Sequence, residues 1–143
     1  MKVRDLVEPQ KMRELMRVAL GDEKADLVVM GGDLVDVYTG ELLRNHCIAT
    51  KDKWIAYVGP EVDHLIGPQT EVIDASGKVV APGFIDAHAH MVYYHSPDEF
   101  IRYAIKSGTT TIITEIMELA FPMGYEGLLA YIDALRDQPI RVL

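Results

Sequence analysis

The sequence of 143 residues contains a single cysteine, Cys47, so it can form neither an intramolecular disulfide nor a cysteine-rich zinc site. A chain that uses no disulfide suits a reducing compartment, and we expect a cytoplasmic location. Cys47 lies in a short apolar stretch that predicts a strand. A buried structural thiol is therefore favoured over a nucleophile.

Basic residues and long apolar runs are also scarce. The chain has 14 Lys and Arg against 22 Asp and Glu, a formal net charge of −8. Because neutralising phosphates requires a basic face, we expect no nucleic-acid partner. No run approaches the roughly 18 apolar residues of a membrane-spanning helix, and the charged N-terminus is unlike a signal peptide, so we expect no membrane partner. The apolar fraction of 49% and charged fraction of 25% are typical of a globular protein.

The remaining pattern divides the chain into three regions. Residues 1–24 predict a helical leader, with apolar residues three and four apart and Gly21 as its stop. Residues 25–81 alternate short apolar runs with turn clusters, which predicts a small antiparallel β-sandwich or barrel. Residues 82–143 follow the order strand, helix, strand, helix, strand, which is typical of parallel βα units. The predicted class is α/β with a β-rich N-terminal part.

Local signals place the elements of the third region. They predict a strand over 84–91, a helix entered through a capping box at 96–99, a β-branched strand over 109–116 and a second helix from about Tyr125. A third strand begins at the end of the chain and leaves an edge that proteins normally cover. We therefore expect the architecture to continue beyond Leu143, or to be completed by another chain.

Candidate metal ligands lie on the first strand of this series. Strand alternation predicts that Phe84, Asp86, His88 and His90 share one face, and both faces of a strand in a parallel sheet should be buried. Ionisable groups on a buried face need compensation, which a divalent metal supplies. The His-x-His spacing by itself favours two core histidines satisfied by hydrogen bonds. The nearby Asp86 and the position at a strand end favour ligation by His88 and His90, with Asp86 in support.

Residues 80–90, which read VAPGFIDAHAH, resemble the first barrel-strand motif of the amidohydrolase superfamily. The leading helix, residues 21–29 and 36–41, and Gly108 followed by three threonines are similar to the adenine deaminase family. The resemblance covers nearly the whole chain. It implies a small β-sandwich followed by the first βαβαβ segment of a metal-binding (β/α)8 barrel, which is incomplete in this chain.

The resemblance also implies an activity: hydrolytic deamination of adenine to hypoxanthine through a metal-bound hydroxide. The metal would be manganese, iron or zinc, as a binuclear centre in the complete enzyme, and would lower the pKa of bound water to roughly 7. His88 and His90 would hold the first ion, with Asp86 in support. The other ligands and the acid–base residues would lie beyond Leu143, so this chain alone is expected to be inactive. The implied partners are a small-molecule purine and either further copies of the chain or a missing C-terminal portion.

Two positions depart from the family's pattern. Adenine deaminases commonly have a His-Glu pair after the second strand, where this chain has Met117 and Glu118. They also commonly have a Glu-Ser-Ser stretch soon after the two histidines, where this chain has residues 92–96, including His95. Glu118 and His95 are thus candidate substrate-pocket residues. A solvated loop carboxylate and an uninvolved loop histidine are the alternatives.

Other functions stay open. The chain could belong to another amidohydrolase, such as a cyclic amidase or a different deaminase. It could also be a truncated, non-catalytic fragment or assembly partner, which its length favours, because an eight-stranded barrel typically needs about 250 residues. Sequence beyond Leu143 would discriminate, since a carboxylated lysine bridging the metals favours a cyclic amidase and a glutamate favours the adenine branch.

Overall fold

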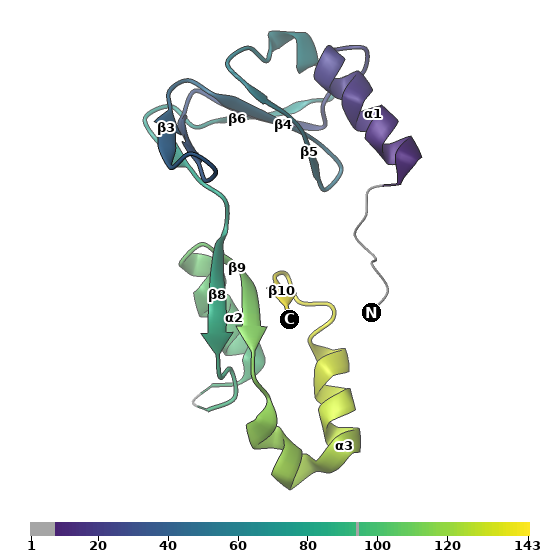
Figure 1. The fold of residues 1–143 in the computed structure, drawn as a ribbon, viewed down its shortest axis with the longest axis vertical. Helices are drawn as coiled ribbons and strands as arrows, with labels where there is room; N and C mark the ends of the chain where they lie inside the picture. The colour runs from purple at the N-terminus through teal and green to yellow at the C-terminus, as the bar shows by residue number, and fades with distance from the viewer. Residues whose placement is uncertain (1–7, 94) are drawn as a thin grey trace. The chain divides into compact units, whose positions relative to one another are not determined.

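A computed structural model of the chain describes residues 8–93 and 95–143. The first seven residues of the predicted leader, and Tyr94, lie outside the described residues. The chain divides into two compact units, residues 1–81 and 82–143 (Figure 1). Within the described ranges, no helix is both long enough and apolar enough to cross a membrane.

The first unit opens with helix α1 (Pro9–Leu20), which begins at a proline and buries Leu15 and Val18. Its predicted stop is confirmed: Gly21 adopts the left-handed conformation, with φ 83°, and its N–H donates to the carbonyl of Val18 at 2.9 Å. Glycine is favoured there because it has no Cβ to clash in that conformation.

Two small sheets make up the rest of this unit. One has the order β5-β4-β1-β6 and the other the order β3-β2-β7. The strands are β1 (Leu27–Met30), β2 (Asp33–Asp36), β3 (Glu41–Leu43), β4 (Cys47–Lys51), β5 (Trp54–Gly59), β6 (Glu71–Asp74) and β7 (Val79–Val80), with a 3₁₀ turn η1 (Asp63–Leu65). The core joins Val18 of α1 to Val28, Ala49 and Leu65, and the free thiol of Cys47 is buried in it as predicted.

The prediction of purely antiparallel pairing is wrong for two strand pairs. β1 pairs with β6, and β2 pairs with β7, in parallel. Tight hairpins join only strands that run antiparallel, whereas a parallel partner must arrive through a long connection. Four strands separate β1 from β6 along the chain, and four separate β2 from β7. The turn clusters in the sequence carry no information on such distant pairing.

The second unit is a parallel sheet with the order β10-β9-β8 and two helices. Its elements are β8 (Phe84–Ala89), α2 (Pro97–Lys106), β9 (Thr109–Thr114), α3 (Met117–Ala134) and β10 (Arg141–Val142). The predicted βαβαβ order is confirmed, as is the cap of α2, where the Ser96 side chain accepts a hydrogen bond from the Glu99 N–H. The core of this unit consists of Ala89, Met91, Ile101, Ile112 and Ile140.

Helix α3 consists of two helical segments that meet at Gly124, which is non-helical at φ 62° and ψ −170°. The segment after Gly124 is the helix predicted from about Tyr125, whereas the segment that begins at Met117 was not predicted. Pro122 and Gly124 suggest a loop in the sequence, because both disfavour a helix interior. Here they lie where the first helical segment ends and the second begins. The early start places Glu118 in the first turn, directly after the sheet.

The predicted burial of β8 on both faces is also wrong for this chain. Phe84 and Ile85 are 62% and 65% exposed, while Ala89 is buried. β8 forms the edge of the described sheet and pairs with β9 along one side only. An edge strand has neighbouring side chains on one flank, so most of its own side chains keep contact with solvent.

Candidate metal centre

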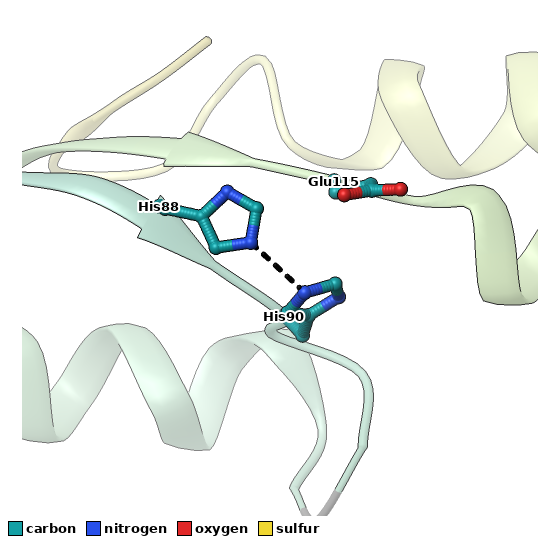
Figure 2. Close-up of side chains that lie close together, drawn as sticks. All are labelled: His88, His90 and Glu115. Carbon is teal, nitrogen blue, oxygen red and sulfur yellow. Dashed lines mark hydrogen bonds between the residues drawn. The ribbon is translucent and has the colours of Figure 1, made fainter.

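His88 and His90 meet at the C-terminal end of β8. Their Nε2 atoms lie 3.0 Å apart, and the two rings cross at 78° (Figure 2). Two metal–nitrogen bonds of about 2.1 Å at right angles would span about 3.0 Å, so this separation matches two imidazoles on one divalent ion. His88 is exposed and His90 is partly buried, so the pair is accessible from solvent.

A third donor, Glu115, was absent from the sequence-based prediction. Its carboxylate and the two imidazoles have ligand atoms that all lie within 4.8 Å of one another. Glu115 follows the last residue of β9, and its N–H donates to the carbonyl of Ala89 at 3.1 Å, which ties the two strand ends together. Figure 2 shows it just beyond the end of the strand that neighbours the histidines' strand. An acidic residue just after the next parallel strand was the sequence signal that could have identified it.

Asp86 does not share a face with the histidines. Between Asp86 and Ala89, β8 advances three residues while β9 advances two, because Asp86 pairs with Ile112 and Ala89 with Thr114. Such a bulge breaks the strict alternation on which the prediction depended. Asp86 consequently faces the helix side, where it lines a pocket of about 310 Å³. It still contacts the site through its Oδ1, which accepts a hydrogen bond from the His88 backbone N–H at 3.2 Å.

Glu118 contacts His90 from the first turn of α3. Its Oε1 pairs with His90 Nδ1, and the two side chains are only 20% and 29% exposed. Hydrogen bonds from its own backbone N–H, from Tyr93 and from His90 lower the pKa of the Glu118 carboxyl, outweighing the opposing effect of burial. Glu118 is therefore a charged group beside the histidine pair, where the sequence had suggested a substrate-pocket residue or a solvated carboxylate.

His95 lies apart from this centre. It is exposed, its ring lies 6.5 Å from that of Tyr103, and it lines the same pocket as Asp86. Within the described part of the chain, the group of close metal donors consists of His88, His90 and Glu115 and leaves His95 out. The structure thus brings the side chains of His88, His90, Glu115 and Glu118 together at the strand ends. His95 lies outside this group, and Asp86 reaches it only through the His88 backbone N–H.

Comparison with known proteins agrees with this architecture. Residues 71–121 match the family model described as "Amidohydrolase family". The solved structure of an N-acyl-D-glutamate deacylase from Bordetella bronchiseptica, complexed with zinc and a phosphonate inhibitor, superposes with a TM-score of 0.60 at 28% identity, covering 84% of this chain and 29% of the deacylase. Part of this chain is thus similar to the amidohydrolase family.

The chain is also similar in sequence to curated adenine deaminases. It is 41% identical to an adenine deaminase of Ruegeria sp. over 135 residues, covering 94% of this chain and 22% of the relative. It is 42% identical to the adenine deaminase of Moorella thermoacetica over 131 residues, covering 91% of this chain and 22% of the relative. The chain spans about a fifth of the length of the curated relatives it matches.

Proposed function

We propose that the chain is the N-terminal part of a metal-dependent hydrolase that deaminates adenine to hypoxanthine. His88 and His90 are its ligands to the first divalent metal, and Glu115 adds a third donor. The observation that carries this proposal is the 3.0 Å approach of the two Nε2 atoms, with the Glu115 carboxylate within 4.8 Å. The similarity to curated adenine deaminases supports the choice of substrate.

The chemistry of the donors fits the proposed ion. Two neutral imidazoles and one carboxylate suit zinc, iron or manganese and leave a divalent ion with a net charge of +1. The related deacylase is complexed with zinc. When bound, such an ion supplies Lewis acidity and makes hydroxide available near neutral pH.

The residues of this chain would hold the metal ion and orient its ligands. His88 and His90 fix the ion from one strand, and Glu115 joins the neighbouring strand to it. Asp86 supports His88 through the hydrogen bond to its backbone N–H. His95 is retained as a candidate pocket residue, on a loop near the strand end.

We infer a matching architecture. Residues 25–81 correspond to a small β-sandwich, residues 1–24 to a leader, and residues 82–143 to the first βαβαβ segment of a (β/α)8 barrel. The parallel order β10-β9-β8 and the donors at the C-terminal strand ends support this assignment, because barrel enzymes of this type place their sites there. A C-terminal portion or further copies of the chain would supply the remaining ligands in a cytoplasmic enzyme.

The test separates metal binding from activity. The chain, freed of metal, is titrated with zinc and with manganese, and the complete protein that carries it is assayed for the absorbance change from adenine to hypoxanthine. We expect the chain to bind one ion weakly without activity, and the complete protein to release ammonia from adenine. Hydrolysis of a cyclic amide with no action on adenine would overturn the proposed substrate and favour the cyclic amidase.

A further inference from the structure

We propose that Glu118 is a positioning residue that fixes His90 in the tautomer with the proton on Nδ1, which leaves Nε2 free to bind a metal. The value of this tautomer for metal binding rests on the proposed function. The contact between Glu118 and His90 does not depend on which substrate the enzyme uses. It assigns Glu118 a task at the metal centre in place of a contact with substrate.

The first step concerns the hydrogen on His90. Nδ1 of this ring pairs with the Glu118 carboxylate. An ionised carboxylate can only accept a hydrogen bond, so Nδ1 must be the donor. In a neutral imidazole the other nitrogen then carries a lone pair, and a hydrogen bond made by one nitrogen commonly selects the role of the other in this way.

The second step concerns where the lone pair lies. Nε2 of His90 is the atom that lies 3.0 Å from Nε2 of His88. If His90 Nε2 accepts, the hydrogen in this contact must come from His88 Nε2. The metal-free chain should therefore hold its two histidines in opposite tautomers. Metal binding must displace a proton from Nε2 of His88 and needs no such change at His90.

The surroundings hold the ring and the carboxylate in place. The Tyr93 ring stacks on the His90 ring at 4.9 Å between centroids and 25° between planes. Tyr93 also hydrogen-bonds the Glu118 carboxylate. Glu118 lies in the first turn of α3, where the partial positive charge of a helix N-terminus favours an anion. The contact with His90 is thus made between two restrained side chains.

Histidine tautomers can be read directly in the metal-free chain. Long-range ¹H–¹⁵N correlation spectra are recorded at about pH 8.5, some two units above the ordinary imidazole pKa. We expect His90 with its proton on Nδ1 and His88 with its proton on Nε2. In Glu118→Ala, His90 should shift to the Nε2–H form that free imidazole side chains favour. Glu126→Gln, an exposed carboxylate change on the same helix, should leave both signals unchanged.

Cobalt(II) titration adds a functional readout. Glu118→Ala should weaken cobalt binding by roughly 10- to 100-fold, as losses of groups that orient metal-bound histidines do. Glu118→Gln, whose amide oxygen can still accept from Nδ1, should recover part of that loss. The backbone amide spectrum of each variant establishes that it is folded.

The outcomes separate the two proposals. Nε2–H at His90 in the wild-type chain, or an unchanged tautomer in a folded Glu118→Ala, would overturn the positioning role even if the chain binds cobalt. A tautomer switch at His90 without measurable cobalt binding would support the positioning role and count against the metal centre alone.

Discussion

At the scale of single residues, the chemistry concentrates in a few side chains at two strand ends. His88 and His90 come from one strand, Glu115 follows the next, and Glu118 comes from the helix after it. The first three present donor atoms to a common point, and the fourth holds one of them by its second nitrogen. Metal affinity should therefore depend on each of the three donors separately.

Removing an imidazole should abolish most metal binding. In His88→Ala or His90→Ala, two donors remain, which leaves a divalent ion mostly hydrated. We expect zinc affinity to fall by more than about 100-fold. Loss of a group that only orients a metal ligand typically costs about 10- to 100-fold, and loss of the ligand itself should cost more. Competition with a chromophoric chelator measures this loss. His46→Ala is the matched control, because His46 lies in the first unit, where its ring hydrogen-bonds the Arg44 carbonyl. Equal affinities for all three variants would exclude the site.

A substitution at Glu115 tests the one metal donor that the sequence did not suggest. Glu115→Gln keeps the size of the side chain and removes its charge, so an ion at this site loses an anionic ligand. We expect about a tenfold weaker affinity for zinc or manganese, of the order seen when a group supporting a metal site is lost. Isothermal titration of the metal-free chain checks it. An unchanged affinity would mean that Glu115 lies near the ion without binding it.

At the scale of elements, the buried core that stabilises the second unit lies on one face of its sheet. Ile112 of β9 is fully buried, whereas its neighbour Ile113 points to the other face and is 44% exposed. Ile101 of α2 packs in the same core as Ile112. The other sheet face carries exposed apolar side chains such as Ile85. Neighbouring residues of one strand should therefore differ sharply in their effect on stability.

This contrast predicts the outcome of two isoleucine truncations. Ile112→Ala removes buried methylene and methyl groups and leaves a cavity, which should cost about 2–5 kcal/mol in the free energy of unfolding. Ile113→Ala should cost less than about 1 kcal/mol, since its side chain already contacts solvent. Urea denaturation of both variants measures the difference. Similar losses at the two positions would contradict the assigned faces of β9.

The N-terminal cap of α2 gives a second element-scale prediction. Ser96 accepts from the Glu99 N–H at 3.4 Å, a long hydrogen bond, so its loss should fall at the lower end of the usual range. We expect Ser96→Ala to cost about 0.5–1 kcal/mol and Ser96→Asp to retain the cap. Thermal unfolding followed by circular dichroism distinguishes them. Equal destabilisation by both substitutions would show that the cap contributes nothing.

At the scale of the whole chain, charge pairing ties distant segments of the first unit together. Asp26 accepts hydrogen bonds from the Asp52 backbone N–H at 2.7 Å and from Lys51 Nζ at 2.6 Å. The bond from the Asp52 N–H and then the one from Lys51 lower the pKa of the Asp26 carboxyl in the folded protein. These contacts join the start of β1 to the turn between β4 and β5.

The lowered pKa of Asp26 predicts how stability depends on pH. Because the folded pKa lies below the unfolded one, the stabilisation is fully present above about pH 4 and is lost as the pH falls through the folded value. Asp26→Asn should therefore lower the free energy of unfolding at pH 7 by about 1 kcal/mol, a modest cost for a half-exposed pair, and much less near pH 2.5. Urea titrations at the two pH values measure it. An equal loss at both would contradict the ionic origin.

The sequence by itself determined the local elements and the identity of the histidine pair. Helix caps, glycine stops and hydrophobic period depend on residues a few positions apart, so α1, α2 and the βαβαβ order were predictable from the printed sequence. The second segment of α3, from Tyr125, was predictable in the same way, but the first segment, from Met117, was not, because Pro122 and Gly124 disfavour a helix interior.

Only the tertiary structure decided which residues share a site. Strand register across about 25 residues brings Glu115 to His90, and a bulge in β8 turns Asp86 to the opposite face. The parallel pairs β1–β6 and β2–β7 arise in the same way, through long connections. Pairing between distant segments depends on the packing of whole strands and helices against one another. The local pattern of apolar residues does not predict this pairing. A shift of one residue in strand register would move every side chain of that strand to the other face of the sheet.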